Sequence, residues 1–136
     1  MRNINKIIVH CSATPESKDV TIDTIRKEHV EDNGYSDIGY HWIIPLSGSV
    51  EKGRPESISG KHSKDFNKNS IGVCYIGGVD KDMNPKDTRT EGQKETLKCL
   101  LEDIKDRYPN AEIIGHRNIS SNTSPSFDAK AEYNNI

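Results

Sequence analysis

Short apolar runs rich in β-branched residues recur along the chain, and two longer segments place apolar residues every three or four positions. A short apolar run between turn residues is typical of a buried strand, whereas the three-to-four spacing is typical of a helix with one buried face. The apolar runs predict strands at residues 6–10, 40–46, 70–78 and 111–116. A short strand at residues 50–53 is predicted after the turn at residues 47–49.

The two periodic segments carry helix start signals. Thr21 can cap a helix that runs to about residue 32, whose buried face would consist of Ile22, Ile25 and His29. Thr90 and Gln93 have the form of a capping box and open a second helix, which ends near residue 109. A last short helix is predicted from Asp128 onward. Strands interspersed with helices predict an α/β fold in which helices pack against one sheet.

The chain has 136 residues, which fits a single domain spanning residues 1–136 with one core. Its net charge of −2 and its scattered basic residues give no positive field, so we expect no nucleic-acid partner. No stretch approaches the roughly 20 apolar residues that span a bilayer, so we expect no membrane partner. We also expect a monomer. The first six residues lack the apolar core of a signal peptide, which predicts synthesis in the cytoplasm.

Three cysteines occur at widely separated positions, Cys11, Cys74 and Cys99. An odd number with wide spacing argues against a disulfide framework. We therefore expect each cysteine to pack as a small apolar side chain.

Two histidines lie at the C-terminal ends of predicted strands. His10 ends the strand at residues 6–10, and His116 ends the strand at residues 111–116. If these strands are parallel neighbours, both imidazoles meet at one edge of the sheet, where ligands gather in open α/β sheets. Two neutral imidazoles could then begin a zinc site. The alternative is two unrelated histidines, each with its own hydrogen bonds, and the spacing alone does not decide.

Two further residues have both a structural and a functional interpretation. Tyr40 could belong to the core, or it could present its hydroxyl to a substrate carbonyl. Arg54 could be a solvated surface residue, or its guanidinium could bind a carboxylate or a sugar.

Several motifs stand in a fixed order from residue 6 to residue 133 and together resemble one family. They are IIVHCSAT (7–14), IGYHWII (38–44), VEKGRPE (50–56), HSKDFNKNSIGVCYIGG (62–78), GHRN (115–118) and SPSFDAKAEY (124–133). The ordered set resembles the type 2 N-acetylmuramoyl-L-alanine amidases. That family includes the small phage amidases called lysozymes and the animal peptidoglycan-recognition proteins.

The resemblance implies a central mixed sheet flanked by helices, with one zinc ion in a groove. It implies hydrolysis of the amide between the lactyl group of muramic acid and the first L-alanine of bacterial peptidoglycan. By position, His10 and His116 match two zinc ligands, and Tyr40 matches a tyrosine that activates water or stabilises the oxyanion. His62 and Asn69 fall in a segment expected to contact substrate.

The chain departs from the family pattern in the loop after His116. Ser124 stands where the resemblance implies a cysteine as the third zinc ligand, and Asn122 stands where many active members have a lysine. A thiol loses its proton when it binds zinc, whereas a serine hydroxyl stays protonated and is a weak ligand. Asn122 can donate a hydrogen bond but carries no charge. We therefore expect a zinc amidase that is impaired by Ser124.

Three explanations for Ser124 remain open. A natural cysteine was replaced in this chain, or the chain is a degenerate member that binds peptidoglycan without cutting it, or another group completes the metal site. Asp128 or a water is the candidate for such a group, although a helix cap is the simpler role of Asp128. A regulator that binds another protein through the same fold is a further class. Action on the cell wall would follow lysis or export.

Overall fold

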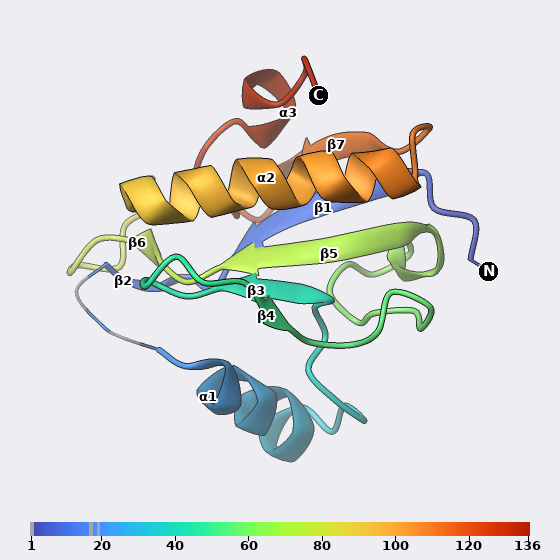
Figure 1. Ribbon diagram of the computed structural model, residues 1–136. Coiled ribbons are helices and arrows are strands. Elements are labelled where there is room, and N and C mark those ends of the chain that lie inside the picture. The colour runs from blue at the N-terminus through green and yellow to red at the C-terminus, as the bar shows by residue number, and fades with distance from the viewer. Residues whose placement is uncertain (1, 17, 19) are drawn as a thin grey trace.

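The computed structural model describes all residues of the chain except 1, 17 and 19. Its main sheet has five strands in the order β4-β3-β5-β1-β7 (Figure 1). β1 pairs in parallel with both β5 and β7, β3 pairs in parallel with β5, and β4 pairs antiparallel with β3. The strands are β1 (Lys6–Cys11), β3 (Trp42–Ile44), β4 (Glu51–Lys52), β5 (Ser70–Tyr75) and β7 (Glu112–Gly115). The predicted mixed sheet is confirmed.

The predicted strand at residues 70–78 is shorter in the structure because glycines interrupt it. β5 ends at Tyr75, and Gly77 and Gly78 have φ angles of +133° and +99°. These angles lie where residues with a side chain are strained, so the extended run breaks there. Gly78 then begins the two-residue strand β6 (Gly78–Val79), which pairs in parallel with β2 (Thr14–Pro15). This small second sheet was not predicted, because two residues that include a proline carry no strand signal.

Side-chain caps place the helices where the sequence predicts them. Thr21 accepts a hydrogen bond from the backbone of Thr24 and opens α1 (Ile22–Lys27), which continues as the π-helix η1 (Glu28–Asp32). Thr90 and Gln93 form the complete capping box of α2 (Glu91–Arg107). Asp128 accepts from the backbone N–H of Ala131 and caps α3 (Ala129–Glu132). The cap role of Asp128 is therefore confirmed.

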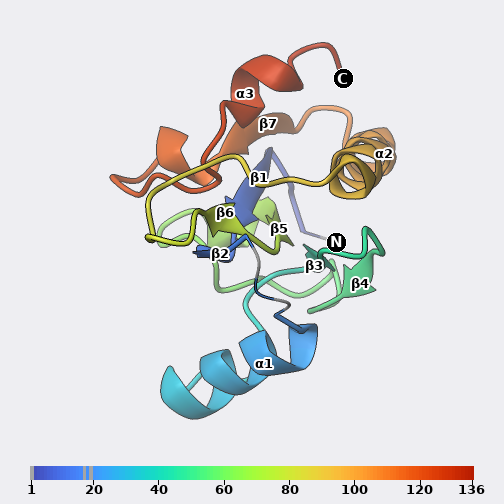
Figure 2. The same cartoon turned by 90° about the vertical axis from the view of Figure 1, so that its left-hand side faces the viewer.

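Helices cover both faces of the sheet. Figures 1 and 2 show α2 and α3 on one face and α1 on the other. The larger core lies under α2, where alternate residues of β1 and β5 meet the apolar face of the helix: Ile7, Val9, Ile71, Val73, Leu97, Leu101 and Ile104. A smaller core faces α1 and consists of Val20, Ile25, Ile38, Ile43 and Ile76.

The alternation of side chains along β1 decides on which face of the sheet His10 lies. Val9 and Cys11 pack in the core under α2, so His10 between them points to the opposite face. Cys11 and Cys74 are buried and free, as expected, whereas Cys99 is exposed on α2. None of the helices in the described part of the chain has the length and apolar composition of a transmembrane helix.

Candidate active site

Parallel pairing of β1 and β7 brings the two strand-end histidines together. Val9 lies opposite Gly115 in the register, so the next residues of the two strands, His10 and His116, emerge side by side. Their ring centroids are 4.5 Å apart. His10 is 2% exposed, whereas His116, in the short 3-10 turn η3 (His116–Asn118), is half-buried. The two imidazoles therefore converge, as the sequence predicts.

Ser124 is held against the residues that follow both histidines. Its hydroxyl oxygen accepts the backbone N–H of Cys11 at 2.9 Å, and its carbonyl accepts the N–H of Arg117 at 2.7 Å. The side-chain oxygen of Asn122 accepts the N–H of Ser124 at 2.8 Å. The polar loop thus holds Ser124 against the backbone next to both histidines, and Asn122 shapes that loop.

Tyr40 lies beside the histidine pair, just before β3 begins. Its ring centroid is 5.2 Å from that of His10. Its backbone carbonyl accepts the N–H of Arg54, which fixes the segment against the chain that follows β4. Burial raises the pKa of the Tyr40 hydroxyl well above its usual value, and the neighbouring Cys74 thiol adds to the effect. The hydroxyl therefore keeps its proton and can act as a hydrogen-bond donor at neutral pH.

Burial keeps the central histidines neutral. It lowers the pKa of His10 well below the usual value, and the nearby His62 and His116 lower it further. Burial likewise lowers the pKa of His116, and it lowers that of His62 to about 3. A neutral imidazole has one nitrogen lone pair to offer a metal ion or a hydrogen-bond donor.

An open cavity of about 590 Å³ lies next to these groups. It is lined by His29, Tyr35, Tyr40, Lys61, His62, Ser63, Lys64, Asn67 and His116. Sequence reasoning missed His29 as a site residue. Its Nδ1 accepts the N–H of Gly39 at 2.9 Å, and its ring centroid lies 5.6 Å from that of Tyr40. The available signal was a histidine on the otherwise apolar face of the predicted first helix.

Arg54 requires a correction. It is only 9% exposed, so it is not a solvated residue. Its guanidinium donates to the carbonyls of Ile38, Ser59 and Asp37 at 2.7, 3.0 and 3.2 Å. It is not among the residues that line the cavity. Arg54 therefore stabilises the segment before Tyr40, and its predicted contact with a carboxylate or sugar stays a prediction.

Asn69 also lies away from the histidines. It precedes β5, and in the register the first residue of β5 pairs with Lys6, whereas His10 pairs with Cys74 near the other end. Its side-chain amide donates to the carbonyl of Asn3 at 2.8 Å. The structure does not bring Asn69 to the cavity beside His10, so the substrate contact predicted for it has no support in this geometry.

The donors present can be compared with the needs of the zinc ion that the resemblance implies. A catalytic zinc takes three protein ligands. His10 and His116 can supply two, and Ser124, which the resemblance matches to the third ligand, has a neutral hydroxyl that already accepts the backbone N–H of Cys11. Within the described residues, no group of three or more histidine, cysteine, aspartate or glutamate side chains is arranged to hold a metal ion. The site therefore fits zinc only as a weak two-histidine centre.

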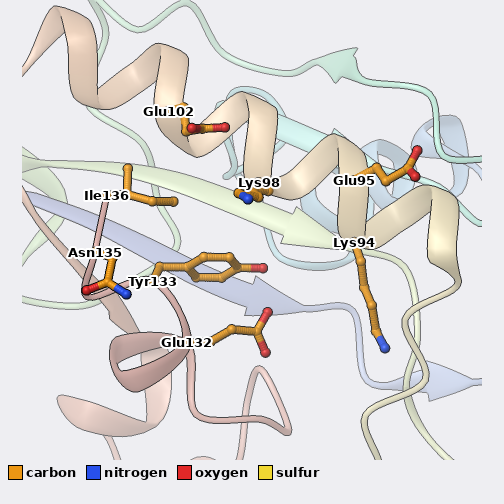
Figure 3. A pocket seen from close by; sticks show the side chains of 8 residues that line it. All are labelled: Lys94, Glu95, Lys98, Glu102, Glu132, Tyr133, Asn135 and Ile136. Atoms are coloured by element: carbon orange, nitrogen blue, oxygen red, sulfur yellow. The ribbon is translucent and has the colours of Figure 1, made fainter.

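A second cavity, of about 540 Å³, lies on the opposite side of the sheet between α2 and the C-terminal residues (Figure 3). Lys94, Glu95, Lys98 and Glu102 come from α2, and Tyr133 and Ile136 form its apolar part. It contains charges of both signs and no histidine or cysteine. The chemistry is therefore concentrated on the face that carries His10.

Comparisons with known proteins identify the family and the fold. The family model described as N-acetylmuramoyl-L-alanine amidase matches residues 1–127. The endolysin of Escherichia phage T7 is 42% identical over 124 residues, which cover 91% of this chain and 82% of that protein. Peptidoglycan-recognition protein SC2 of Drosophila melanogaster is 30% identical over 107 residues, covering 76% of this chain and 55% of that protein. The solved N-acetylmuramoyl-L-alanine amidase LysC of Clostridium intestinale has the same fold, with a TM-score of 0.82, 24% identity, and coverage of 96% and 82% of the two chains.

Proposed function

The chain belongs to the N-acetylmuramoyl-L-alanine amidase family, and we propose that its substrate is bacterial peptidoglycan. It hydrolyses the amide between the lactyl group of muramic acid and the L-alanine of the stem peptide, at a rate that Ser124 limits. The observation that carries this proposal is the convergence of His10 and His116 beside an open cavity that His116 lines, with the hydroxyl of Ser124 bound to the backbone N–H of the residue after His10. The chain acts as a monomer, on the cell wall, after lysis or export.

His10 and His116 would hold the zinc ion. When bound, zinc supplies a Lewis acid that polarises an amide carbonyl and activates water near neutral pH. Tyr40 is protonated at neutral pH, and burial raises its pKa further, so its hydroxyl donates a hydrogen bond to the substrate carbonyl oxygen as negative charge develops there. The side-chain amide of Asn122, in the loop that carries Ser124, can donate a further hydrogen bond. The cavity beside His62 and His29 holds the peptide next to the two histidines.

In this proposal Ser124 limits turnover. A cysteine thiol loses its proton readily when it binds zinc, because its reference pKa is near 8.5. A serine hydroxyl keeps its proton and offers only a neutral oxygen, whereas zinc ligands generally bind in the deprotonated form. The hydroxyl of Ser124 also already accepts the N–H of Cys11. A chain with serine here holds zinc weakly, and only the fraction of molecules with bound metal can cleave.

A second function, binding without cleavage, is favoured by the same residue. The cavity lining does not include Ser124, so peptide recognition does not depend on the missing thiol. In that case the chain would retain peptidoglycan in the cavity and leave the amide intact.

The test compares the wild-type chain with the Ser124→Cys variant on purified muropeptides in the presence of zinc. Ser120→Cys is the matched control, because it adds a thiol to an exposed position in the same loop. The proposal predicts that Ser124→Cys releases peptides with a free N-terminal L-alanine much faster than the wild type, and that Ser120→Cys does not. If the wild type and Ser124→Cys both bind insoluble peptidoglycan and neither cleaves it, binding alone is the function.

A further inference from the structure

His62 makes a direct hydrogen bond to one of the two histidines proposed as zinc ligands. The Nε2 atom of His10 lies 2.8 Å from the Nδ1 atom of His62, and the two rings meet edge to face with centroids 4.9 Å apart. Of the two ring nitrogens of His10, only Nδ1 then remains available for a metal ion. We propose that His62 is a positioning residue that fixes the ring orientation and tautomer of His10, so that Nδ1 carries a free lone pair.

The surrounding chain is built to hold the ring of His62 in this place. The side-chain oxygen of Asn67 accepts two backbone hydrogen bonds, from His62 at 3.0 Å and from Ser63 at 2.9 Å, and so fixes the loop. The far nitrogen of the ring, Nε2, lies 3.3 Å from the hydroxyl of Ser70. The ring is therefore held at both of its nitrogens and at its backbone.

Two glycines provide the space that the ring occupies. A Cβ atom at Gly72 would lie 2.6 Å from ring atoms of His62, and a Cβ atom at Gly60 would lie 2.7 Å from its Cδ2 atom. A side chain at either position would collide with the ring of His62. The position of the His62 ring thus depends on two segments of the chain, the loop before His62 and the central strand β5.

The direction of the hydrogen bond follows from what a metal ligand requires. A nitrogen that binds zinc carries no proton, so a ligating Nδ1 leaves the proton of His10 on Nε2. That proton is donated to Nδ1 of His62, whose own proton is then on Nε2, facing the oxygen of Ser70. Partners of this kind orient metal-binding histidines, and their loss typically weakens metal affinity by about 10–100-fold.

This inference rests on the proposed function only in taking His10 as a metal ligand, and its test uses no peptidoglycan. In the metal-free wild type, nitrogen-15 NMR of the imidazoles should show His10 protonated on Nε2, with slow exchange of that proton. In His62→Leu, which has no acceptor, the proton should exchange rapidly with water. A wild-type His10 protonated on Nδ1 would overturn the inference, whether or not the protein binds zinc.

Zinc affinity gives the second readout, measured by chelator competition in the Ser124→Cys background. His62→Leu should weaken binding by about 10–100-fold. His62→Asn places a carboxamide oxygen near the position of Nδ1 and should restore much of the affinity, whereas Lys68→Ala, an exposed change in the same segment, should have no effect. If His62→Leu and His62→Asn lower the melting temperature but leave the zinc dissociation constant unchanged, the role of His62 is structural and the inference is wrong. Zinc binding without cleavage would instead count only against the proposed function.

Discussion

Arg89 is the residue whose replacement should most destabilise the fold without touching the histidines. Its side chain is 1% exposed, and its guanidinium makes paired hydrogen bonds to the carboxylates of Asp87 and Glu132, at 2.8–2.9 Å. It also lies over the ring of Phe127, 3.5 Å from the centroid, and donates to the hydroxyl of Tyr133. One side chain therefore ties the segment before α2 to α3 and to the end of the loop that presents Ser124.

The cost of Arg89→Met can be worked out from these contacts. Breaking a buried ion pair costs about 3–5 kcal/mol, but the side chains of Asp87 and Glu132 are 35% and 44% exposed and keep part of their hydration. The contact with Phe127 adds about 1–2 kcal/mol because the guanidinium is desolvated. We expect a net loss of about 2–4 kcal/mol in the free energy of unfolding at pH 7. Lys86→Met is the control and should leave the free energy of unfolding nearly unchanged, because its pair with Glu16 is exposed.

The deficit of Arg89→Met should also depend on pH. Hydrogen bonds from Arg89 hold the pKa values of Asp87 and Glu132 below their usual values in the folded state. Lowered carboxylate pKa values stabilise the fold above the unfolded-state pKa, and this stabilisation is lost as the pH falls through the folded-state value. Urea denaturation at several pH values should therefore show the variant approaching the wild type in acid. A deficit below about 1 kcal/mol at pH 7, or one that does not shrink in acid, would refute the reasoning.

Two further predictions concern the groups around the histidine cluster. Burial lowers the pKa of His41 to about 4, so the unfolded chain takes up protons first, and stability should fall by up to about 3 kcal/mol as the pH drops from about 6.5 to 4. Urea titrations check this, and His41→Asn should lack that part of the pH dependence. Gly72→Ala should cost about 1–3 kcal/mol and displace His62, because its Cβ atom meets the ring at 2.6 Å. Gly92→Ala, with its nearest neighbour at 3.7 Å, is the control and should not destabilise the fold.

Local signals predicted the elements that local interactions define. The capping box of Thr90 and Gln93 fixes the start of α2, and the apolar run after Lys6 becomes the central strand β1. The same reasoning placed His10 and His116 at strand ends, and the parallel register then brought them together. These two positions could be predicted because each histidine lies at the end of a strand, and the pairing of the two strands then defines where the imidazoles lie.

Contacts between distant segments could not be predicted in the same way. Arg54 is buried because three carbonyls, from the segments at residues 37–38 and 59, accept hydrogen bonds from its guanidinium. No local sequence pattern predicts that arrangement. The bond between His10 and His62 depends on glycines at positions 60 and 72, which sequence reasoning alone treats as turn or strand residues. Such contacts are properties of the assembled fold, and they decide which polar residues reach the site.

Zinc content tests most directly the claim that His10, His116 and Ser124 form one metal site that lacks a thiolate. Wild type, Ser124→Cys and Ser120→Cys would be dialysed against limiting zinc and measured by elemental analysis. We predict about one zinc per chain for Ser124→Cys and far less than one for the other two proteins. A wild-type chain that retains one tightly bound zinc, or a Ser124→Cys chain that retains none, would contradict the claim.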